Sequence, residues 1–470
     1  MSAAATRVAA TDPSANDSSS KGPALGKDFG RLWGAAIGSN LSDGIARLAI
    51  PLAAVGLTTD PIAIAVLTAL AYVPWLIFGV PSGMIVDRVD RRHAMAAASV
   101  VRVVAAAGVA LAIATDQITL WVLAAAVLVF GLGETLFDNA TNAVLPSLVR
   151  RRGLDKANGR IQAAQVGVDM FVAQPVSGVL FSLAIVLPMV VSGAGYLIAG
   201  ALVLLLPATA ARAGRSELPA ADAGDGDRSG EAPAAVPLRA ALGFLWRHRY
   251  LRSMVLVTSL VGGFLAFAQA ITVLLFVDHY GVTAELVGIV TAGIGLGGVA
   301  GALTAGRVVV RLGRGRTMLG AAIAGGVGLV GVGLAPNAWV AVLAYSASAY
   351  GIAMWNVPWG SLRQSIIPGH MLGRVLGAAR TVTWGLMPVA TMLGGWVARV
   401  DLQLPYLIGG AGTVLVSLIA GRLLLSADAH MPADDKNDTD ATQVVSDAEP
   451  VEEVRPAGAG VTVPQAPRRS

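Results

Sequence analysis

Residues 83–92 read Gly-Met-Ile-Val-Asp-Arg-Val-Asp-Arg-Arg, a short charged run between two long apolar stretches. These stretches, 62–86 and 94–114, each contain the roughly 20 mostly apolar residues that a helix needs to cross the hydrocarbon core of a bilayer. Basic residues in a short loop between two such helices are typical of the cytoplasmic side of a membrane protein. The stretch therefore predicts a fold that crosses a membrane several times.

The composition of the whole chain indicates the same class. Of 470 residues, 55% are hydrophobic and only 13% are charged, and the mean hydropathy is +0.67. Soluble domains carry about 25% charged residues, so this chain would expose large apolar patches unless lipid covered them. The net charge of +5 comes from arginines in short loops, and we expect no nucleic-acid partner.

The same length criterion, applied along the chain, predicts twelve spans separated into two sets of six by a polar segment. The spans are 30–57, 62–86, 94–114, 119–142, 160–184, 186–207, 252–278, 284–308, 317–335, 338–361, 374–399 and 403–425. The polar segments hold too little apolar surface to fold alone. We therefore predict five parts: a disordered N-terminal tail (1–29), a six-helix bundle (30–207), a cytoplasmic linker (208–248), a second six-helix bundle (249–426) and a disordered C-terminal tail (427–470).

The distribution of arginine and lysine predicts the orientation of these spans. One set of loops is rich in basic residues: Arg88, Arg91, Arg92, Arg150, Arg151, Arg152, Lys156, Arg247, Arg249, Arg252, Arg307, Arg311, Arg314, Arg316, Arg363 and Arg374. The opposite loops are nearly free of cations, with Arg399 as the exception. Positively charged loops stay in the cytoplasm, so both termini are expected there, in a multi-pass cell-membrane protein.

Two six-span sets joined by a linker indicate an internal duplication. Residues 148–178 can be aligned with 366–396, since both lead from a short loop into a span rich in small residues. Repeated halves around a site near the bilayer midplane are typical of secondary transporters. We expect an all-α protein of twelve transmembrane helices in two pseudo-symmetric six-helix bundles.

The loop at 83–92 also resembles the cytoplasmic signature of the major facilitator superfamily, Gly-x-x-x-Asp-(Arg/Lys)-x-Gly-Arg-(Arg/Lys). Asp90 stands where the family usually has the second glycine. The residues that match are Gly83, Asp87, Arg88, Arg91 and Arg92, and a weaker echo occurs at Gly306 and Arg307. The resemblance implies the major facilitator fold, in which a glycine lets two helices approach and this loop latches the cytoplasmic side.

Other segments resemble the branch that contains macrolide-efflux and enterobactin-exporter proteins. They are Phe29–Trp33 with Asp43 and Pro51-Leu52, Leu145–Val149 through Ala157-Asn158, and Gly373–Val375. The resemblance implies export of a drug, macrolide or siderophore-like molecule by proton antiport and rocking of the two bundles. Two departures leave antiport an inference: the fifth span reads Gln174-Pro175-Val-Ser-Gly178-Val179 where many antiporters have Gly-Pro-x-x-Gly-Gly, and the fourth span offers Glu134 in place of arginine.

Charged residues inside the spans are the candidates for chemistry, because each costs about 2.5–3.5 kcal/mol near the middle of the membrane. Asp43 and Arg47 share a face of the first span, either as a structural ion pair or with Asp43 exchanging a proton beside Arg47. Glu134 and Asp138 share a face of the fourth span, and their repulsion favours a proton on one of them. Glu134 is the candidate for this proton.

For the remaining intramembrane charges we expect structural partners. Asp138 is expected to pair with Arg91 or Arg92, and Asp169 of the fifth span with Arg102 of the third, although Asp169 is also a candidate for titration. The proton-coupling candidates are Asp43, Glu134 and Asp169. In the fold that the resemblance implies, the first, fourth, seventh and tenth spans line the cavity, which adds substrate-contact candidates: Asn40, Arg47, Gln269, Trp355 and Asn356.

Small and aromatic residues in the spans have structural explanations. Gly293, Gly297 and Gly301 recur every four residues in the eighth span, a pattern that favours close helix packing and could also provide a plane of sliding. Trp121 and Trp339 stand at the starts of spans, as expected for residues of the interfacial aromatic belt.

Several residue types that other functions need are missing. The chain has no cysteine and no Walker-type lysine, and its five histidines show no metal-ligand spacing, so we expect no enzyme activity, no metal and no cofactor. The predicted function is export of a small amphipathic molecule, by a monomer that also binds protons. The alternatives are a proton-coupled uptake permease of the same fold and a non-transporting membrane scaffold or sensor.

Overall fold

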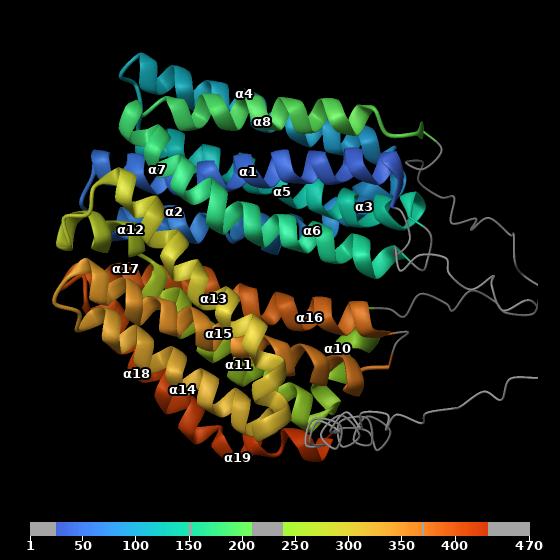
Figure 1. Ribbon diagram of the computed structural model, residues 1–470, viewed down its shortest axis with the longest axis vertical. Helices are drawn as coiled ribbons and strands as arrows, with labels where there is room; N and C mark the ends of the chain where they lie inside the picture. Colours follow the sequence, from blue (N-terminus) through green and yellow to red (C-terminus); the bar gives the residue numbers. More distant parts are fainter. Residues whose placement is uncertain (1–24, 150–152, 209–237, 369–370, 431–470) are drawn as a thin grey trace, which may run out of the picture.

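A computed structural model describes residues 25–149, 153–208, 238–368 and 371–430, and these residues form helices and short connections without a strand (Figure 1). The first half runs from α1 to α8. Its helices are α1 (Gly26–Leu57), α2 (Pro61–Leu70), α3 (Val73–Arg88), α4 (Arg91–Ala114), α5 (Leu120–Leu148), α6 (Leu154–Val168), the π-helical turn η3 (Asp169–Ala173), α7 (Gln174–Leu183) and α8 (Leu187–Leu204).

The second half follows the same plan of long helices and short turns. Its elements are α10 (Leu238–Arg247), α11 (Arg249–Gln269), α12 (Thr272–Leu274), η4 (Leu275–His279), α13 (Ala284–Leu312), α14 (Arg314–Gly333), α15 (Ala338–Ile366), α16 (Leu372–Gly385), α17 (Met387–Ala398), α18 (Leu404–Ile419), α19 (Gly421–Leu425) and η6 (Ala427–His430). In Figure 1 the blue-to-green helices α1–α8 form one bundle, and the yellow-green-to-red helices α10–α19 form the other.

Prolines explain why three of the predicted spans are broken. A proline opens α3, α7 and α17, where its fixed φ and missing N–H suit a first turn but interrupt a helix that arrives from before it. The second span therefore divides into α2 and α3, and the eleventh into α16 and α17. The fifth divides into α6 and α7, with η3 between them. π-helical turns of this kind are frequent at functional sites.

Eight helical segments are long and apolar enough to cross a membrane. They are Pro61–Arg88, Arg91–Ala114, Leu120–Leu148, Leu187–Leu204, Arg249–His279, Ala284–Leu312, Arg314–Gly333 and Ala338–Ile366. The other four predicted spans correspond to α1, which carries several charges, and to the divided or short segments α6–α7, α16–α17 and α18–α19. Each predicted span thus coincides with helix, while the number twelve stays a prediction for the membrane.

The two bundles touch at what we call the closed end, where α2 packs on α17 and α7 packs on α13. Asp60 accepts hydrogen bonds from Arg399 there, at 2.8 Å from Nη2 and 3.0 Å from Nε. Gly178 and Gly288 lie where α7 and α13 approach backbone to backbone, and a Cβ on Gly178 would lie 2.8 Å from the carbonyl oxygen of Ala284. Side chains larger than hydrogen do not fit this contact.

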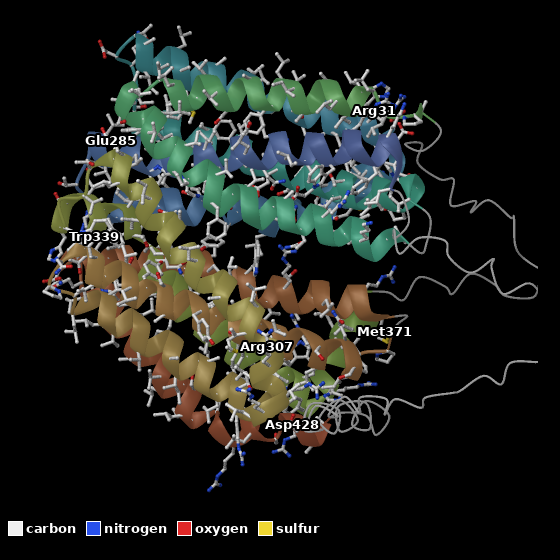
Figure 2. All side chains as sticks on the ribbon, viewed as in Figure 1. Arg31, Glu285, Arg307, Trp339, Met371 and Asp428 are labelled. Atoms are coloured by element: carbon white, nitrogen blue, oxygen red, sulfur yellow. The ribbon has the colours of Figure 1, made fainter. Side chains whose placement is uncertain are left out.

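Figure 2 labels residues at the closed end and at the opposite end of the molecule. Arg31 and Met371 lie toward the end opposite the closed end, and Glu285 and Trp339 lie at the closed end. Trp121 and Trp339 are 84% and 67% exposed at the starts of α5 and α15, as expected for the interfacial belt. Gly293, Gly297 and Gly301 face α15 within one bundle, which confirms their packing role and places no sliding plane between the bundles there.

Two of the predicted polar segments include described helix. The linker prediction 208–248 includes α10, an ordered helix that packs on α16 and α11. The C-terminal tail begins with the turn η6, whose Asp428 accepts a hydrogen bond from the backbone N–H of Arg314 at 3.1 Å. The rest of the predicted tails and linker, at 1–24, 209–237 and 431–470, lies outside the described residues, as do Arg150–Arg152.

Candidate functional site

Two adjoining cavities lie among these helices. The first, of about 570 Å³, is lined mainly by α1, α2, α3, α5, α6 and η3, and we call it the N cavity. The second, of about 500 Å³, is lined by α11 and α14–α18, and we call it the C cavity. Arg380 and Trp384 of α16 line both cavities and so mark the boundary between them. Both volumes are in the range of small-molecule sites.

In the N cavity, Arg47 of α1 joins two carboxylates from other helices. Its Nη1 donates to Oδ2 of Asp169 at 2.6 Å, and its Nη2 donates to Oε1 of Glu134 at 3.1 Å. Asp169 opens the turn η3 and Glu134 lies in α5. Since 49% of the Arg47 side chain is exposed, this cluster is accessible to molecules that enter the cavity.

Asp43, one helical turn before Arg47, is bound on the opposite side by α4 and α8. Both of its carboxylate oxygens accept from Nη1 of Arg102 at 3.0 Å, and Oδ1 also accepts from the hydroxyl of Tyr196 at 2.7 Å. The hydroxyl of Ser39 donates to Oδ2 at 3.2 Å. The Asp43 carboxylate reaches the wall of the N cavity, but these donors already occupy it.

Arg102 is fully buried (0% exposed) between aromatic rings. Its guanidinium carbon lies 4.5 Å from the ring centre of Tyr196 and 5.1 Å from that of Phe137. Gly133 leaves room for this side chain, because a Cβ there would lie 2.7 Å from Cγ of Arg102. A buried, stacked and ion-paired arginine of this kind holds helices together.

The structure exchanges the partners of two predicted ion pairs. An ion pair of Asp43 with Arg47 was one of two alternatives, and Asp169 was expected to pair with Arg102, but the structure pairs Asp43 with Arg102 and Asp169 with Arg47. A four-residue spacing places two side chains on one helix face without specifying the helices that lie beside them. The long side chain of Arg47 extends to α5 and η3, whereas the short Asp43 contacts α4 and α8.

The predicted partner of Asp138 was also wrong. Oδ2 of Asp138 accepts from Nε2 of Gln165 at 3.4 Å, while Arg91 donates to the carbonyl oxygen of Ala143 at 2.9 Å. Arg92 donates to Asp90 of its own loop and to the carbonyl oxygen of Leu206, each at 3.0 Å. Asp138 is therefore a fourth carboxylate of the N cavity, and its partner is an amide instead of a cation.

The signature loop is held by its own charges. Oδ1 of Asp90 accepts from the backbone N–H of Arg92 at 2.9 Å and so caps α4, and the Arg92 side chain beside it holds the pKa of Asp90 below its ordinary value. Asp87 and Arg88 are exposed, and no ion pair among the described residues includes them. A Cβ on Gly83 would meet no atom within 4 Å, so the expected helix approach at this glycine is not made in this conformation.

The remaining candidates divide between the cavities. Asn40 lines the N cavity, and its Nδ2 donates to the carbonyl oxygen of Ala36 at 2.7 Å. Trp355 and Asn356 line the C cavity. Gln269 is the last residue of α11 and is not among the residues that line either cavity.

The sequence analysis missed two cavity arginines and an aromatic cluster. Arg363 was assigned to a loop but lies within α15, and Arg380 lies inside the predicted span 374–399. The rule that selected Asp43, a charge inside a span, also applies to Arg380 and could have identified it. The ring of Trp384 lies 5.9 Å from Trp75 and 6.5 Å from Tyr72, and this cluster joins the two bundles. No sequence signal identifies it, because it depends on how the bundles approach.

Comparison with known proteins places this geometry in a family. The sequence profile of the Major Facilitator Superfamily matches residues 32–392. The chain is 28% identical to macrolide efflux protein A of Streptococcus pyogenes over 156 residues, which are 33% of this chain and 38% of that protein. It is 28% identical to the enterobactin exporter EntS of Citrobacter koseri over 309 residues, 64% of this chain and 69% of that protein.

Solved structures show the same fold at low sequence identity. The structure of a bacterial homologue of the iron transporter ferroportin in an inward-facing state has a TM-score of 0.65 and 14% identity, and covers 86% of this chain and 100% of its own. A point mutant of the nucleoside transporter NupG also gives 0.65, with 12% identity over 85% of this chain and 100% of its own. With its two helical bundles and apolar helices, the chain belongs to the Major Facilitator Superfamily and is a multi-pass membrane protein.

Proposed function

We propose that this protein is a secondary active transporter that exports a small amphipathic molecule in exchange for protons. The observation that carries the proposal is Arg47, held between Glu134 and Asp169 in an accessible cavity between the bundles. A scaffold has no evident need for such a shared, exposed ion pair inside a membrane, where each charge is costly. The named relatives, a macrolide efflux protein and an enterobactin exporter, support export over uptake.

Charge balance in the N cavity suggests how protons take part. Four carboxylates line it, and the first bundle supplies two arginines that pair with three of them: Arg47 to Glu134 and Asp169, and Arg102 to Asp43. Arg380 of the second bundle also lines this cavity, so one further positive charge, as a proton or as part of a cationic substrate, would neutralise the site. A proton on Glu134 or Asp169 would release that carboxylate from Arg47, so binding of a proton changes the contacts of α1 with α5 and η3.

Of the three proton-coupling candidates, we assign coupling to Glu134 and Asp169 and a positioning role to Asp43. Asp43 already accepts hydrogen bonds from Arg102 and Tyr196 and is mostly buried. Its two donors fix α1 against α4 and α8, and this fixes the direction in which Arg47 extends. Asp138 is a further acid that could pass a proton along the N cavity.

The positive-inside pattern assigns the end with the arginine-rich loops to the cytoplasm, together with both termini and the polar linker. The closed end then faces outward, and the protein is in an inward-facing state. Rocking of the bundles would separate Asp60 from Arg399 and bring the signature loop residues Asp87, Arg88, Arg91 and Arg92 against the second bundle. We place the protein in a bacterial-type inner membrane as a monomer.

The experiment uses inverted membrane vesicles with an acid interior and follows the pH gradient while macrolides, siderophores and cationic dyes are added. We expect one or more compounds to collapse the gradient with the native protein. Glu134→Gln and Asp169→Asn should abolish this collapse, whereas Asp28→Asn, an exposed acid paired with Arg31 outside the cavity, should retain it.

Each other result has a definite meaning. Substrate-driven gradient collapse that survives in both Glu134→Gln and Asp169→Asn would exclude these residues as the coupling site. Accumulation of compounds in right-side-out vesicles driven by an inward proton gradient would indicate the uptake permease. Binding without movement of any compound in either vesicle would indicate a sensor or scaffold.

A further inference from the structure

The two cavities differ in the sign of their net charge. The N cavity contains the carboxylates of Asp43, Glu134, Asp138 and Asp169 against the guanidinium groups of Arg47 and Arg380. The C cavity contains the guanidinium groups of Arg363 and Arg380, and no acidic residue is among the described residues that line it. The proposed proton chemistry uses the acids of the N cavity and leaves these two arginines without a role.

Neither arginine is ion-paired within the part of the chain that the structure describes. Arg363 uses its Nε to donate to the carbonyl oxygen of Trp359 at 3.3 Å, and its guanidinium carbon lies 5.0 Å from the ring centre of that tryptophan. Arg380 lies 4.2 Å from the ring centre of Trp384 and 5.1 Å from that of Trp75. Asp138 is the acid whose charge acts on Arg380, but the two do not come within ion-pair distance.

Two unpaired guanidinium groups in a cavity with apolar and aromatic walls form a site for an anion. A guanidinium presents planar, parallel N–H donors that fit an oxyanion such as a carboxylate. Low-dielectric walls strengthen this attraction compared with water. Stacking on tryptophan stabilises a guanidinium only in part, and it leaves the outward N–H groups of both arginines available to a ligand.

The tryptophans add a second recognition element. Trp355, Trp359 and Trp384 line the C cavity, with Leu265 and Leu329 among the aliphatic side chains. Indole rings offer flat apolar faces that stack on aromatic rings. We infer that the C cavity binds an oxyanion group carried on an aromatic or flat apolar body, with Arg363 and Arg380 contacting the anion and the tryptophans contacting the body.

This inference rests on the proposed function and specifies its substrate class. A molecule that carries an acid group at one end and a basic or neutral polar group at the other would match both cavities. Arg380 and Trp384 line both cavities, so the body of such a molecule would pass beside them. An anion bound in the C cavity would also weaken the charge interaction between Arg380 and Asp138. Substrate binding would in this way affect the acids of the N cavity.

The test measures binding to the purified full-length protein by isothermal titration calorimetry with three probes of the same shape. They are 1-naphthaleneacetate, its neutral amide, and 1-naphthylmethylamine as the cation. We expect the carboxylate to bind about tenfold more tightly than the amide. Arg380→Gln and Arg363→Gln should each reduce that preference to about threefold or less, Arg380→Lys should keep part of it, and Arg311→Gln, an exposed arginine outside both cavities, should leave it unchanged.

The inference is overturned if the amide or the amine binds as tightly as the carboxylate, or if the preference survives in both glutamine variants. Arg380→Lys separates loss of charge from loss of folding, because it keeps the cation. The vesicle experiment separates the two proposals. Binding of the carboxylate without proton-coupled export of any compound would contradict the proposed function alone, and proton-coupled export without a carboxylate preference would contradict this inference alone.

Discussion

The two cavities are built from the same kind of helix but differ in how their arginines are stabilised. At the N cavity Arg47 pairs with two acids at the cavity surface, and Arg102 pairs with Asp43 inside the bundle. In the C cavity Arg363 and Arg380 rest on tryptophan faces. An ion-paired network can exchange protons without an external ligand, whereas an arginine stacked on an aromatic ring is ready to receive an anion. The comparison suggests that coupling and substrate selection are assigned to different bundles.

The largest expected effect comes from the buried part of the N cavity. Arg102→Ala would leave Asp43 as an uncompensated buried charge, and we expect a loss of about 3–5 kcal/mol in the free energy of unfolding. Replacing both partners, as Asp43→Leu with Arg102→Met, should restore much of this loss because no charge remains unpaired. Thermal unfolding in detergent measures both. Equal stability of Arg102→Ala and the native protein would show that Asp43 finds another partner.

A substitution in the exposed part of the N cavity should change proton coupling instead of the free energy of unfolding. Glu134→Gln removes one of the two acids that share Arg47, and we expect the proton movement per substrate to fall at least about tenfold. Binding of a naphthaleneacetate probe in the C cavity should change by less than about threefold, since no direct contact is lost. Proton flux and calorimetry on the same preparation give both numbers. A parallel loss of both would contradict the division between the cavities.

Trp384 tests the boundary between the cavities. Trp384→Ala removes the ring on which Arg380 rests, and we expect naphthaleneacetate to bind about five- to tenfold more weakly. Trp384→Phe keeps an aromatic face and should cost less than about threefold. Calorimetry with both variants gives the comparison, with Trp121→Ala, an exposed belt residue, as the matched control. Equal affinities for alanine and phenylalanine would exclude a stacking role.

The smallest effect is expected at the closed end, where Asp60 and Arg399 line neither cavity. The hydrogen bonds from Arg399 hold the pKa of Asp60 below its ordinary value of about 3.9. The ionised carboxylate therefore stabilises the pair fully when the pH is above the ordinary pKa. This stabilisation is lost only as the pH falls through the lowered pKa. Acidification to pH 5 should therefore leave the pair intact. Because the pair is exposed, Asp60→Asn should change the fraction of molecules in which the closed end is open by less than about fivefold.

Opening of the closed end can be measured by cross-linking of introduced cysteines, because the chain has no cysteine of its own. Cysteines introduced one each into α2 and α17 would be the only thiols, and the rate at which they cross-link reports closure at that end. An unchanged rate between pH 7 and pH 5 is expected. A sharp fall in that range would show that some other group near the closed end titrates there.

The fold was accessible from the sequence, because span length, hydropathy and loop charge are local properties. Residues 83–92 and the predicted spans agree with the family and with the helices found. The ion pairs were not accessible in the same way. Asp43, Arg47, Arg102 and Asp169 were selected as charges inside spans, but the partner of each depends on which helices become neighbours. Arg363 shows a related limit: it lies one turn inside α15 instead of in a loop, and a shift of one turn moves a side chain from the surface to a cavity.

At Gly178 and Gly288, the addition of a single methyl group should shift the equilibrium between the states in which the closed end is closed and open. A Cβ on Gly178 would lie 2.8 Å and 2.9 Å from the backbone oxygens of Ala284 and Glu285, and backbone cannot move aside as a flexible side chain can. Gly178→Ala would thus penalise the state in which this end is closed while leaving the state in which it is open unaffected. Each 1.4 kcal/mol of that penalty shifts the equilibrium about tenfold. The alanine variant should therefore populate the form in which this end is open, and that form could be isolated for structure determination without an inhibitor or an antibody.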